Sequence, residues 1–456
     1  MLHKNISKSK EASVPSAVYV DYIRLTSGEG KTVDIKNICV KMELTESLYT
    51  PYITLRLEFT DATNLIESFP IIGQEKISVS MSRKPPGGNM ETMKLNFKVL
   101  KYPLYAKPKS ESLQVFSIEA ISNHAYDSTF KRISRSYSGT AEEQIQKIFK
   151  EDLNYSSANG GSFKVKGSDV SRHRGIINIQ TPLQAAEYFR KIAFDGNNTP
   201  FYLYQTLEKG DLCFTSTTDL YSQTPHGTYY DVRQFSGDGG GAKDYDERKT
   251  RIVDISSDLR LNKYDQAQMG AWASANYFLD WSDKSSMLEE YSYNDGNKLA
   301  SKSPLIDNSV TKDYNQHQEH ISVNDASFKD EDNYGFMRKR NIAKSNSFKA
   351  TLETMSHDLR LFGDFKLNAG TIIDLKIPKA VDPQEKEGSG EWDEHFSGNY
   401  LITSSIHTVE NGEYYTDCRV KRDSFGSGRT GGGTGGGIAS TATANIATIG
   451  DLGELF

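Results

Sequence analysis

The chain has 456 residues, a formal net charge of -6 and an isoelectric point near 5.9. This length predicts about two to four domains with ordinary hydrophobic cores, and the acidic balance argues against a nucleic-acid-binding surface, which needs a concentrated basic face. No apolar run approaches the ~20 residues needed to cross a membrane, and the N-terminus lacks the apolar core of a signal peptide, so we expect folding in the cytoplasm.

The first predicted region, residues 17–125, follows an N-terminal arm at 1–16 and reads almost entirely as β-structure. Its strand-like runs are Val18–Ile23, Ile38–Met42, Tyr52–Phe59, Ile77–Met81, Leu95–Leu100 and Leu113–Ile118. Runs of this kind at short spacing predict a barrel or a sandwich.

Helical periodicity appears next, in residues 126–200, which we interpret as a small α-containing domain. Thr140 and Glu143 form a capping-box pattern. The apolar residues that follow at helical spacing are Ile145, Ile148, Phe149 and Leu153. Residues 156–167, rich in Gly, Ser and Asn, predict a loop.

A second helix is predicted from Thr181, where Gln184 completes another capping box. Pro182 occupies the first helical position, where its missing N–H costs nothing. The expected buried stripe of this helix is Phe189, Ile192 and Ala193.

The strand pattern returns at residues 201–264 and 346–425, on either side of a polar stretch at 265–345. The runs are Phe201–Tyr204, Leu212–Phe214, Ile252–Leu261, Ile372–Ile377, Ser397–His407 and Tyr414–Val420. Asn411 and Gly412 predict a tight turn that joins the last two runs as a hairpin. We interpret this region as one β-barrel split by an insertion, with two independent units as the alternative.

The C-terminal residues differ in composition from everything before them. Residues 426–437 have the Gly-rich composition of a flexible linker, and residues 438–456 carry scattered apolar side chains with only two charged ones. Such a tail cannot bury itself, so it is either disordered or docked into a groove on a partner. The candidate interface residues are Ile438, Ile446, Ile449, Leu452, Leu455 and Phe456.

We interpret the three cysteines as free, buried thiols, because Cys39, Cys213 and Cys418 are widely spaced and each lies within a strand-like run. The 25 Tyr and 21 Phe, against 13 Pro, also favour strands.

Two patterns approach ligand sites and fail in detail. Residues 237–242 fit the dinucleotide fingerprint G-x-G-x-x-A, but Lys243–Lys249 has no apolar face for a crossover helix, so a surface loop is favoured. Asp330–Gly335 approaches a calcium loop, but Tyr334 stands where an oxygen ligand belongs and Asn341 where a bidentate Glu is needed.

The remaining candidates are weaker. His317 and His320 lack the spacing and third ligand of a zinc protease, and no nucleophile elbow, phosphate loop or Cys-x-x-Cys pair occurs. We therefore predict no catalytic residue, no cofactor and no metal. The short basic clusters Arg172–Arg174 and Arg338–Arg340 are solvated surface or contacts for an acidic neighbour.

The element order in residues 367–425 is a turn at Leu367–Gly370, an alternating strand, a loop with glycines and the final hairpin. This order resembles the closing barrel of baseplate hub proteins in contractile phage tails, a family that includes the hub half of type VI secretion spikes. The resemblance is moderate for Ile177–Asp219. In the rest of the chain only the order of predicted domains is similar. It implies a mainly β fold with a small α+β part: two tube-like β-barrels, the second interrupted by an insertion, with an α-containing domain between them.

The resemblance also implies a structural virion protein and not an enzyme. A homotrimer would form a pseudo-sixfold ring between the sixfold tail tube and the threefold central spike, and would line the channel for genome ejection. The implied partners are the spike, the tail tube or tube-initiator protein, the baseplate wedge proteins and the tape measure protein, with DNA passing through without specific binding. The implied location is the tail baseplate of the virion, after assembly in the host cytoplasm.

Two other classes stay open at this point. A host-binding adhesin of the tail tip would also be rich in Tyr and strands, but would more often carry repeats and a fibrous tail. A cell-wall hydrolase needs only a pair of carboxylates, and single carboxylates are plentiful here.

Overall fold

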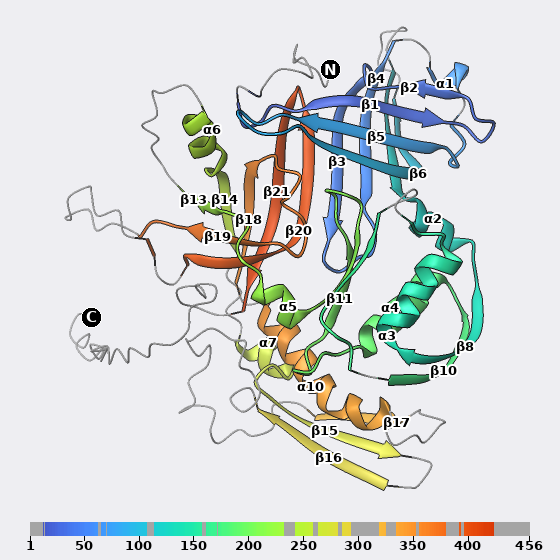
Figure 1. Cartoon of the computed structure of the whole chain (residues 1–456), viewed down its shortest axis with the longest axis vertical. Helices are drawn as coiled ribbons and strands as arrows, with labels where there is room; N and C mark the ends of the chain where they lie inside the picture. Colours follow the sequence, from blue (N-terminus) through green and yellow to red (C-terminus); the bar gives the residue numbers. More distant parts are fainter. Residues whose placement is uncertain are drawn as a thin grey trace, which may run out of the picture.

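The computed structural model describes residues 12, 14–62, 65–69, 71–106, 114–156, 161–170, 172–231, 242–258, 263–280, 285–292, 319–324, 334–352, 355–379, 392–393 and 396–423. Figure 1 shows a large β-structure above, a mixed α/β region at one side and a smaller sheet below. No helix in these ranges is long and apolar enough to cross a bilayer.

One 13-stranded sheet dominates the fold. Its N-terminal strands are β1 (Tyr19–Thr26), β2 (Thr32–Asp34), β3 (Cys39–Ser47), β4 (Thr54–Asp61), β5 (Lys76–Arg83), β6 (Glu91–Ala106) and β7 (Gln114–Ser122), with the short helix α1 (Leu65–Ser68) after β4. Its C-terminal strands are β13 (Thr228–Tyr230), β14 (Ile252–Asp258), β18 (Met355–Phe362), β19 (Ile372–Lys376), β20 (Gly398–Glu410) and β21 (Glu413–Arg422).

The order of strands in this sheet joins the two ends of the chain. The main path is β14-β18-β21-β20-β3-β4-β7-β6-β5-β1-β2, and β19 pairs with both β20 and β13. The antiparallel pair β20–β3 is the link, with Glu410 opposite Lys41 at one end and Ser404 opposite Ser47 at the other. The N-terminal and C-terminal β-regions therefore form one continuous sheet.

Alternation of side chains explains why these segments are strands with one buried face. In β3, Met42 and Leu44 are fully buried while Lys41 and Glu43 lie on the partly exposed face. The two regions share part of their core, because Tyr414 of β21 packs within the N-terminal hydrophobic cluster, while most buried side chains of the C-terminal strands form a second cluster. Large buried side chains of the N-terminal cluster include Phe59, Phe97, Phe116 and Tyr414.

The final hairpin is confirmed. β20 and β21 pair from Glu410 opposite Glu413, and the two residues between them have positive φ, 53° at Asn411 and 79° at Gly412. Asn and Gly tolerate this left-handed geometry, which matches the twist of the flanking strands.

The mixed region packs helices against two small sheets. Its helices are α2 (Asn123–Thr129), α3 (Ala141–Lys147), the π-helix η1 (Ile148–Asp152), α4 (Pro182–Ile192) and α5 (Thr217–Ser222). Its strands are β8 (Ile133–Thr140), β9 (Phe163–Lys166), β10 (Arg172–Gln180), β11 (Phe201–Gln205) and β12 (Leu212–Ser216), paired as β10-β8 and β11-β12-β9. Its core joins Phe149 and Phe189 to Phe201 and Phe214.

Both predicted capping boxes are confirmed, at Thr140 with Glu143 and at Thr181 with Gln184. The predicted loop at residues 156–167 is wrong in part, because β9 lies within it. β9 pairs in parallel with β12, with Phe163 opposite Leu212. The alternation in β9, Phe-Lys-Val-Lys, is only four residues long and lies in a segment rich in Gly, Ser and Asn, so its strand signal is weak.

A separate sheet lies between β14 and β18 in the chain. It contains β15 (Ala273–Asp280), β16 (Ser285–Ser292) and β17 (Glu319–Asn324) in the order β16-β15-β17. The helices of this part are α7 (Lys263–Gln268) and α10 (Tyr334–Leu352), and a further helix, α6 (Ala242–Lys249), lies before β14. β14 and β18 pair directly with each other, so the large sheet is continuous across this intervening segment.

The mainly β fold with a small α+β part is confirmed. The structure differs from the two expected barrels in two respects. The two β-regions share a sheet through β20 and β3, and no ladder among the described strands closes either region into a barrel. β11 and β12, which the sequence groups with the second barrel, pair with β9 and share the core of the mixed region. The domain boundaries stay predictions. All three cysteines are free and buried, as expected.

Replacement of Gly363 by Ala is expected to destabilise the fold by about 2 kcal/mol or more. A Cβ atom there would lie 2.1 Å from Cδ1 of the buried Tyr414 ring. The free energy of unfolding in urea is the measurement, and Gly28→Ala is the control, because a Cβ at Gly28 meets nothing within 4 Å. Equal stabilities of the two variants would contradict the predicted clash.

Candidate functional site

A buried carboxyl group, that of Glu46 on β3, lies where three parts of the chain meet. Its Oε1 accepts hydrogen bonds from the backbone N–H of Ala369 (2.6 Å) and the hydroxyl of Ser405 (2.8 Å). Its Oε2 accepts one from the backbone N–H of Leu207 (2.7 Å). These donors lie before β19, on β20 and after β11, so one side chain joins both regions of the large sheet to the mixed region.

The ionisation of Glu46 is shifted by this environment. Burial raises its pKa to about 8, against the opposing effect of the Ser405 hydroxyl and the two backbone N–H groups. The carboxyl group therefore changes charge near neutral pH.

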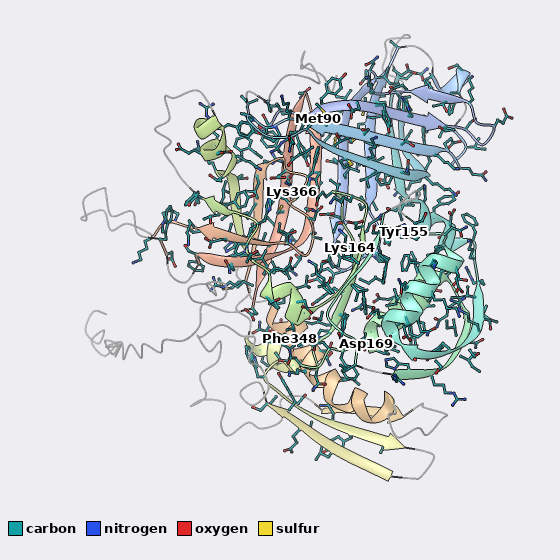
Figure 2. The ribbon with its side chains drawn as sticks, in the orientation of Figure 1. Met90, Tyr155, Lys164, Asp169, Phe348 and Lys366 are labelled. Carbon is teal, nitrogen blue, oxygen red and sulfur yellow. The ribbon has the colours of Figure 1, made fainter. Side chains whose placement is uncertain are left out.

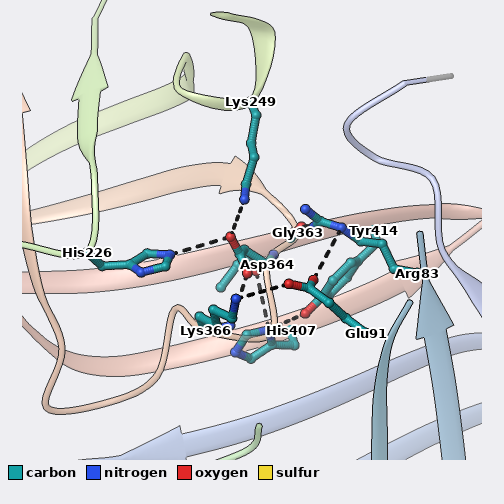
Figure 3. Close-up of polar contacts among 10 residues, drawn as sticks. Arg83, Glu91, His226, Lys249, Gly363, Asp364, Lys366, His407 and Tyr414 are labelled. Carbon is teal, nitrogen blue, oxygen red and sulfur yellow. Dashed lines mark hydrogen bonds and ion pairs between the residues drawn. The ribbon is translucent and has the colours of Figure 1, made fainter. Parts of the chain in front are cut away.

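A second buried carboxylate, Asp364, lies in the loop after β18 and is held by cations from other elements (Figure 3). Its Oδ2 is 2.6 Å from Nζ of Lys249 and 3.5 Å from Nε2 of His226. Burial alone would raise the pKa of Asp364, but the His226 hydrogen bond and the charges of Lys249 and Arg83 outweigh it and hold this pKa well below its usual range.

Arg83 of β5 crosses the junction between the two regions. Its side chain is fully buried, Nη1 donates to the carbonyl oxygen of Gly363, and Nε lies 3.9 Å from Oε2 of Glu91. Glu91 also pairs with Lys366, whose Nζ lies 3.1 Å from Oε1. The N-terminal strands are thereby attached to the loop after β18 by charged contacts as well as by the β20–β3 ladder.

Charged side chains in opposite-sign pairs cover the outer face of the N-terminal strands. Glu43 of β3 stands opposite Arg56 of β4, and Arg56 stands opposite Glu119 of β7. Lys101 of β6 faces Glu119, with Nζ 2.8 Å from Oε2. Opposite charges on neighbouring strands stabilise that register modestly.

The same pattern continues on the C-terminal strands. Arg360 of β18 makes two hydrogen bonds to Asp417 of β21, at 2.7 and 3.0 Å. Arg419 of β21 makes two to Asp358, at 2.8 and 2.9 Å. A shallow groove of about 530 Å³ lies over these pairs and is also lined by Ile406 of β20.

The two sets of charges lie on one surface, because Thr408 of β20 stands opposite Glu43 and Ile406 opposite Thr45. We call this surface, from β14 to β6 and opposite the apolar core, the charged face. Its carboxylates alternate with Lys and Arg, so it has no concentrated charge of either sign.

Most of the sequence-based candidates lie outside the described residues. Residues 237–241, Asp330–Asn333, His317 and the interface residues Ile438–Phe456 lie outside the described residues, as does the side chain of His320. Arg172 and Arg174 lie exposed on β10. In the described ranges, no group of three or more His, Cys, Asp or Glu side chains is arranged to hold a metal.

Sequence reasoning missed Glu46, although a signal was present. Met42 and Leu44 face the core, and Glu46 continues the same alternation, which puts a carboxyl group at a core position. Asp364 gave no such signal, because it lies in a loop and its cationic partners come from elements distant in the chain.

Glu46→Gln is expected to remove a pH dependence of stability. The pKa of Glu46 is raised to about 8 in the folded state. The resulting stabilisation is complete at pH values below the pKa of the unfolded chain, and it is lost as the pH rises through 8. The wild type should lose roughly 2 kcal/mol between pH 6.5 and 8 through this group. The measurement is the difference in the free energy of unfolding between the wild type and the Glu46→Gln variant over this range, because the three buried histidines, whose pKa values burial lowers to about 4, contribute equally to the pH dependence of both proteins.

The control for this prediction is Glu43→Gln, which changes a partly exposed carboxylate on the same strand. This variant should keep the pH dependence of the wild type. An unchanged decline in the Glu46→Gln variant would contradict the assignment.

No protein-family model and no curated protein matches the sequence. Among solved structures, the tail protein from Neisseria meningitidis MC58 aligns with a TM-score of 0.50 and 12% identity over 88% of this chain and 96% of its own. The 43 kDa tail protein of prophage MuSo2 from Shewanella oneidensis aligns with a TM-score of 0.50 and 15% identity over 88% of this chain and 98% of its own. The chain shares its fold with these tail proteins, in agreement with the resemblance to phage tail hubs.

Proposed function

We propose that this chain is a structural subunit of a phage tail baseplate: the hub, which forms a trimeric ring between the sixfold tail tube and the threefold central spike. The observation that carries the proposal is the continuous sheet that joins two β-regions through β20 and β3. One subunit presents two β-regions side by side, so three subunits around an axis present six. Such a ring has the symmetry of the tube on one side and that of the spike on the other.

The edges of the charged face support a head-to-tail ring. In the described residues, β14 pairs along one side with β18, and residues 101–106 of β6 pair along one side with β7. Among the described strands, β14 ends its side of the sheet, and β5 pairs with residues 91–98 of β6, so another strand can add beside β14 and beside residues 101–106 of β6. In the proposed ring, β14 of one subunit pairs with residues 101–106 of β6 of the next, and three such contacts close the charged face into a ring.

The charged face is the surface that we assign to the channel of this ring. Its paired charges offer no concentrated basic patch to phosphate, so DNA would pass during ejection without specific binding. The tape measure protein would occupy the same channel before ejection. A channel lined mainly by unpaired Lys and Arg would contradict this assignment.

The remaining parts of the proposal follow from the same role. The partners are the central spike, the tail tube or tube-initiator protein and the wedge proteins, the location is the virion tail after assembly in the host cytoplasm, and the role is not enzymatic. The apolar tail residues, from Ile438 to Phe456, are the proposed docking segment for the spike or a neighbouring subunit.

The purified full-length chain is expected to be a trimer. Light scattering over a wide concentration range gives the mass, and class averages from electron microscopy give the symmetry of the ring and the presence of a channel. A chain that stays monomeric at high concentration, and also after addition of its spike, would refute the hub assignment.

Truncation at Gly426 is expected to leave the fold intact and to weaken attachment of the spike or of a neighbouring subunit. The last described strand, β21, ends at Arg422, before the truncation, so the strand content measured by circular dichroism should not change. Co-purification of the spike with the truncated and full-length chains measures attachment. Equal recovery of the spike with both chains would exclude the docking role.

A further inference from the structure

A recess of about 520 Å³ opens where the large sheet, the mixed region and α10 meet. Its wall includes Tyr49 after β3, Tyr202 of β11, Met269 after α7 and Leu352 at the end of α10. Tyr202 and Leu352 are buried, whereas Tyr49 is 49% and Met269 58% exposed. Large, partly exposed side chains around a buried aromatic ring are typical of a surface that another segment covers.

The wall of this recess also carries a cation, Lys349 of α10. Burial lowers the pKa of Lys349, and the positive charges of Arg190 and Lys191 lower it further, against the opposing charge of Glu187. An acidic group placed beside Lys349 would relieve this repulsion. The recess therefore suits a segment that is apolar and negatively charged.

The chain leaves the large sheet beside this recess. Lys421, near the end of β21, has its Nζ 5.8 Å from the centroid of the Tyr49 ring. Burial raises the pKa of Tyr221, and the Asp423 carboxylate raises it further, so Asp423 lies near Tyr221, which packs against the cluster that contains Tyr202. α10 also contacts β21 directly, in agreement with its position below the lower ends of β20 and β21 in Figure 1.

The residues after Asp423 have the chemistry that the recess fits. Residues 438–456 contain the apolar side chains named above, and their charged residues, Asp451 and Glu454, are both acidic. A Gly-rich chain as long as residues 424–437 has a root-mean-square span of roughly 20 Å. Attachment over so short a distance gives an effective concentration on the order of millimolar at the recess.

We propose that residues 438–456 dock into the recess of their own chain, with apolar side chains against Tyr49, Tyr202 and Met269 and an acidic side chain facing Lys349. The recess is then covered in the free subunit. The inference rests on the proposed function in one respect: a spike or neighbour that binds the same residues must first displace them from the recess.

Disulfide cross-linking in the full-length chain tests this. The double variant Met269→Cys, Leu452→Cys puts one thiol on the recess and one in the tail, while the three native cysteines are buried. Mild oxidation should link the two within one chain, at a rate about tenfold or more above that of a matched control. Peptide mapping identifies the bond, and non-reducing gels separate links within a chain from links between chains.

The matched control is Met90→Cys, Leu452→Cys. Met90 is 42% exposed and lies in Figure 2 at the far end of the molecule from Phe348, the neighbour of Lys349 on α10. Equal rates for the two pairs, or links formed only between chains, would overturn the proposal. The solution mass of the same samples keeps the two proposals separate: a trimer without the intrachain link refutes only the docking, and a monomer with the link counts only against the hub.

Discussion

The ladder between β20 and β3 is the interaction on which the rest of the structure depends. It joins the N-terminal and C-terminal strands into one sheet. Its register also determines which face of the N-terminal region is continuous with which face of the C-terminal region. Because side chains alternate along a strand, a slip of one residue would turn Ile406 and Thr408 toward the core and replace them with Ser405 and His407. The continuity of the charged face is therefore a direct consequence of this one register.

The junction is stabilised by two buried carboxyl groups in opposite ways. Glu46 is surrounded by neutral donors, so burial dominates and favours its protonated form. Asp364 accepts a hydrogen bond from His226 and lies near the positive charges of Lys249 and Arg83, and these together outweigh burial and favour its ionised form. Each group has partners on segments that meet only when both β-regions are in place, and a buried polar group that loses its partners costs about 1–3 kcal/mol. These contacts favour one relative position of the regions over others that apolar packing alone would tolerate.

The sequence predicts those parts of the fold that depend on near neighbours. The capping boxes at Thr140 and Thr181 and the turn at Asn411 each involve a few adjacent residues, so the sequence displays them directly. The pairing of β20 with β3 could not be predicted, because hydrophobic alternation shows that a segment is a strand but not which distant strand it joins. For the same reason the sharing of one sheet by the two β-regions was not expected. β9 was missed because its alternation spans only four residues in a segment with a loop-like composition. At the site, Glu46 was within reach of the alternation in β3, whereas the cations around Asp364 come together only in the folded chain.

The place of β3 in the middle of the sheet also sets an order of events during synthesis. Its partner on one side, β4, follows at once, but its partner on the other side, β20, comes so late that Glu46 and Ser405 are 359 residues apart. At a translation rate of about 5–20 residues per second, this side of β3 waits roughly 20–70 seconds for its strand. During that time Lys41 and Glu43 keep charges on the exposed edge, a feature that discourages pairing with other nascent chains. The sheet is thus completed only after β20 has left the ribosome, so a chain that stops before β20 lacks the joined surface.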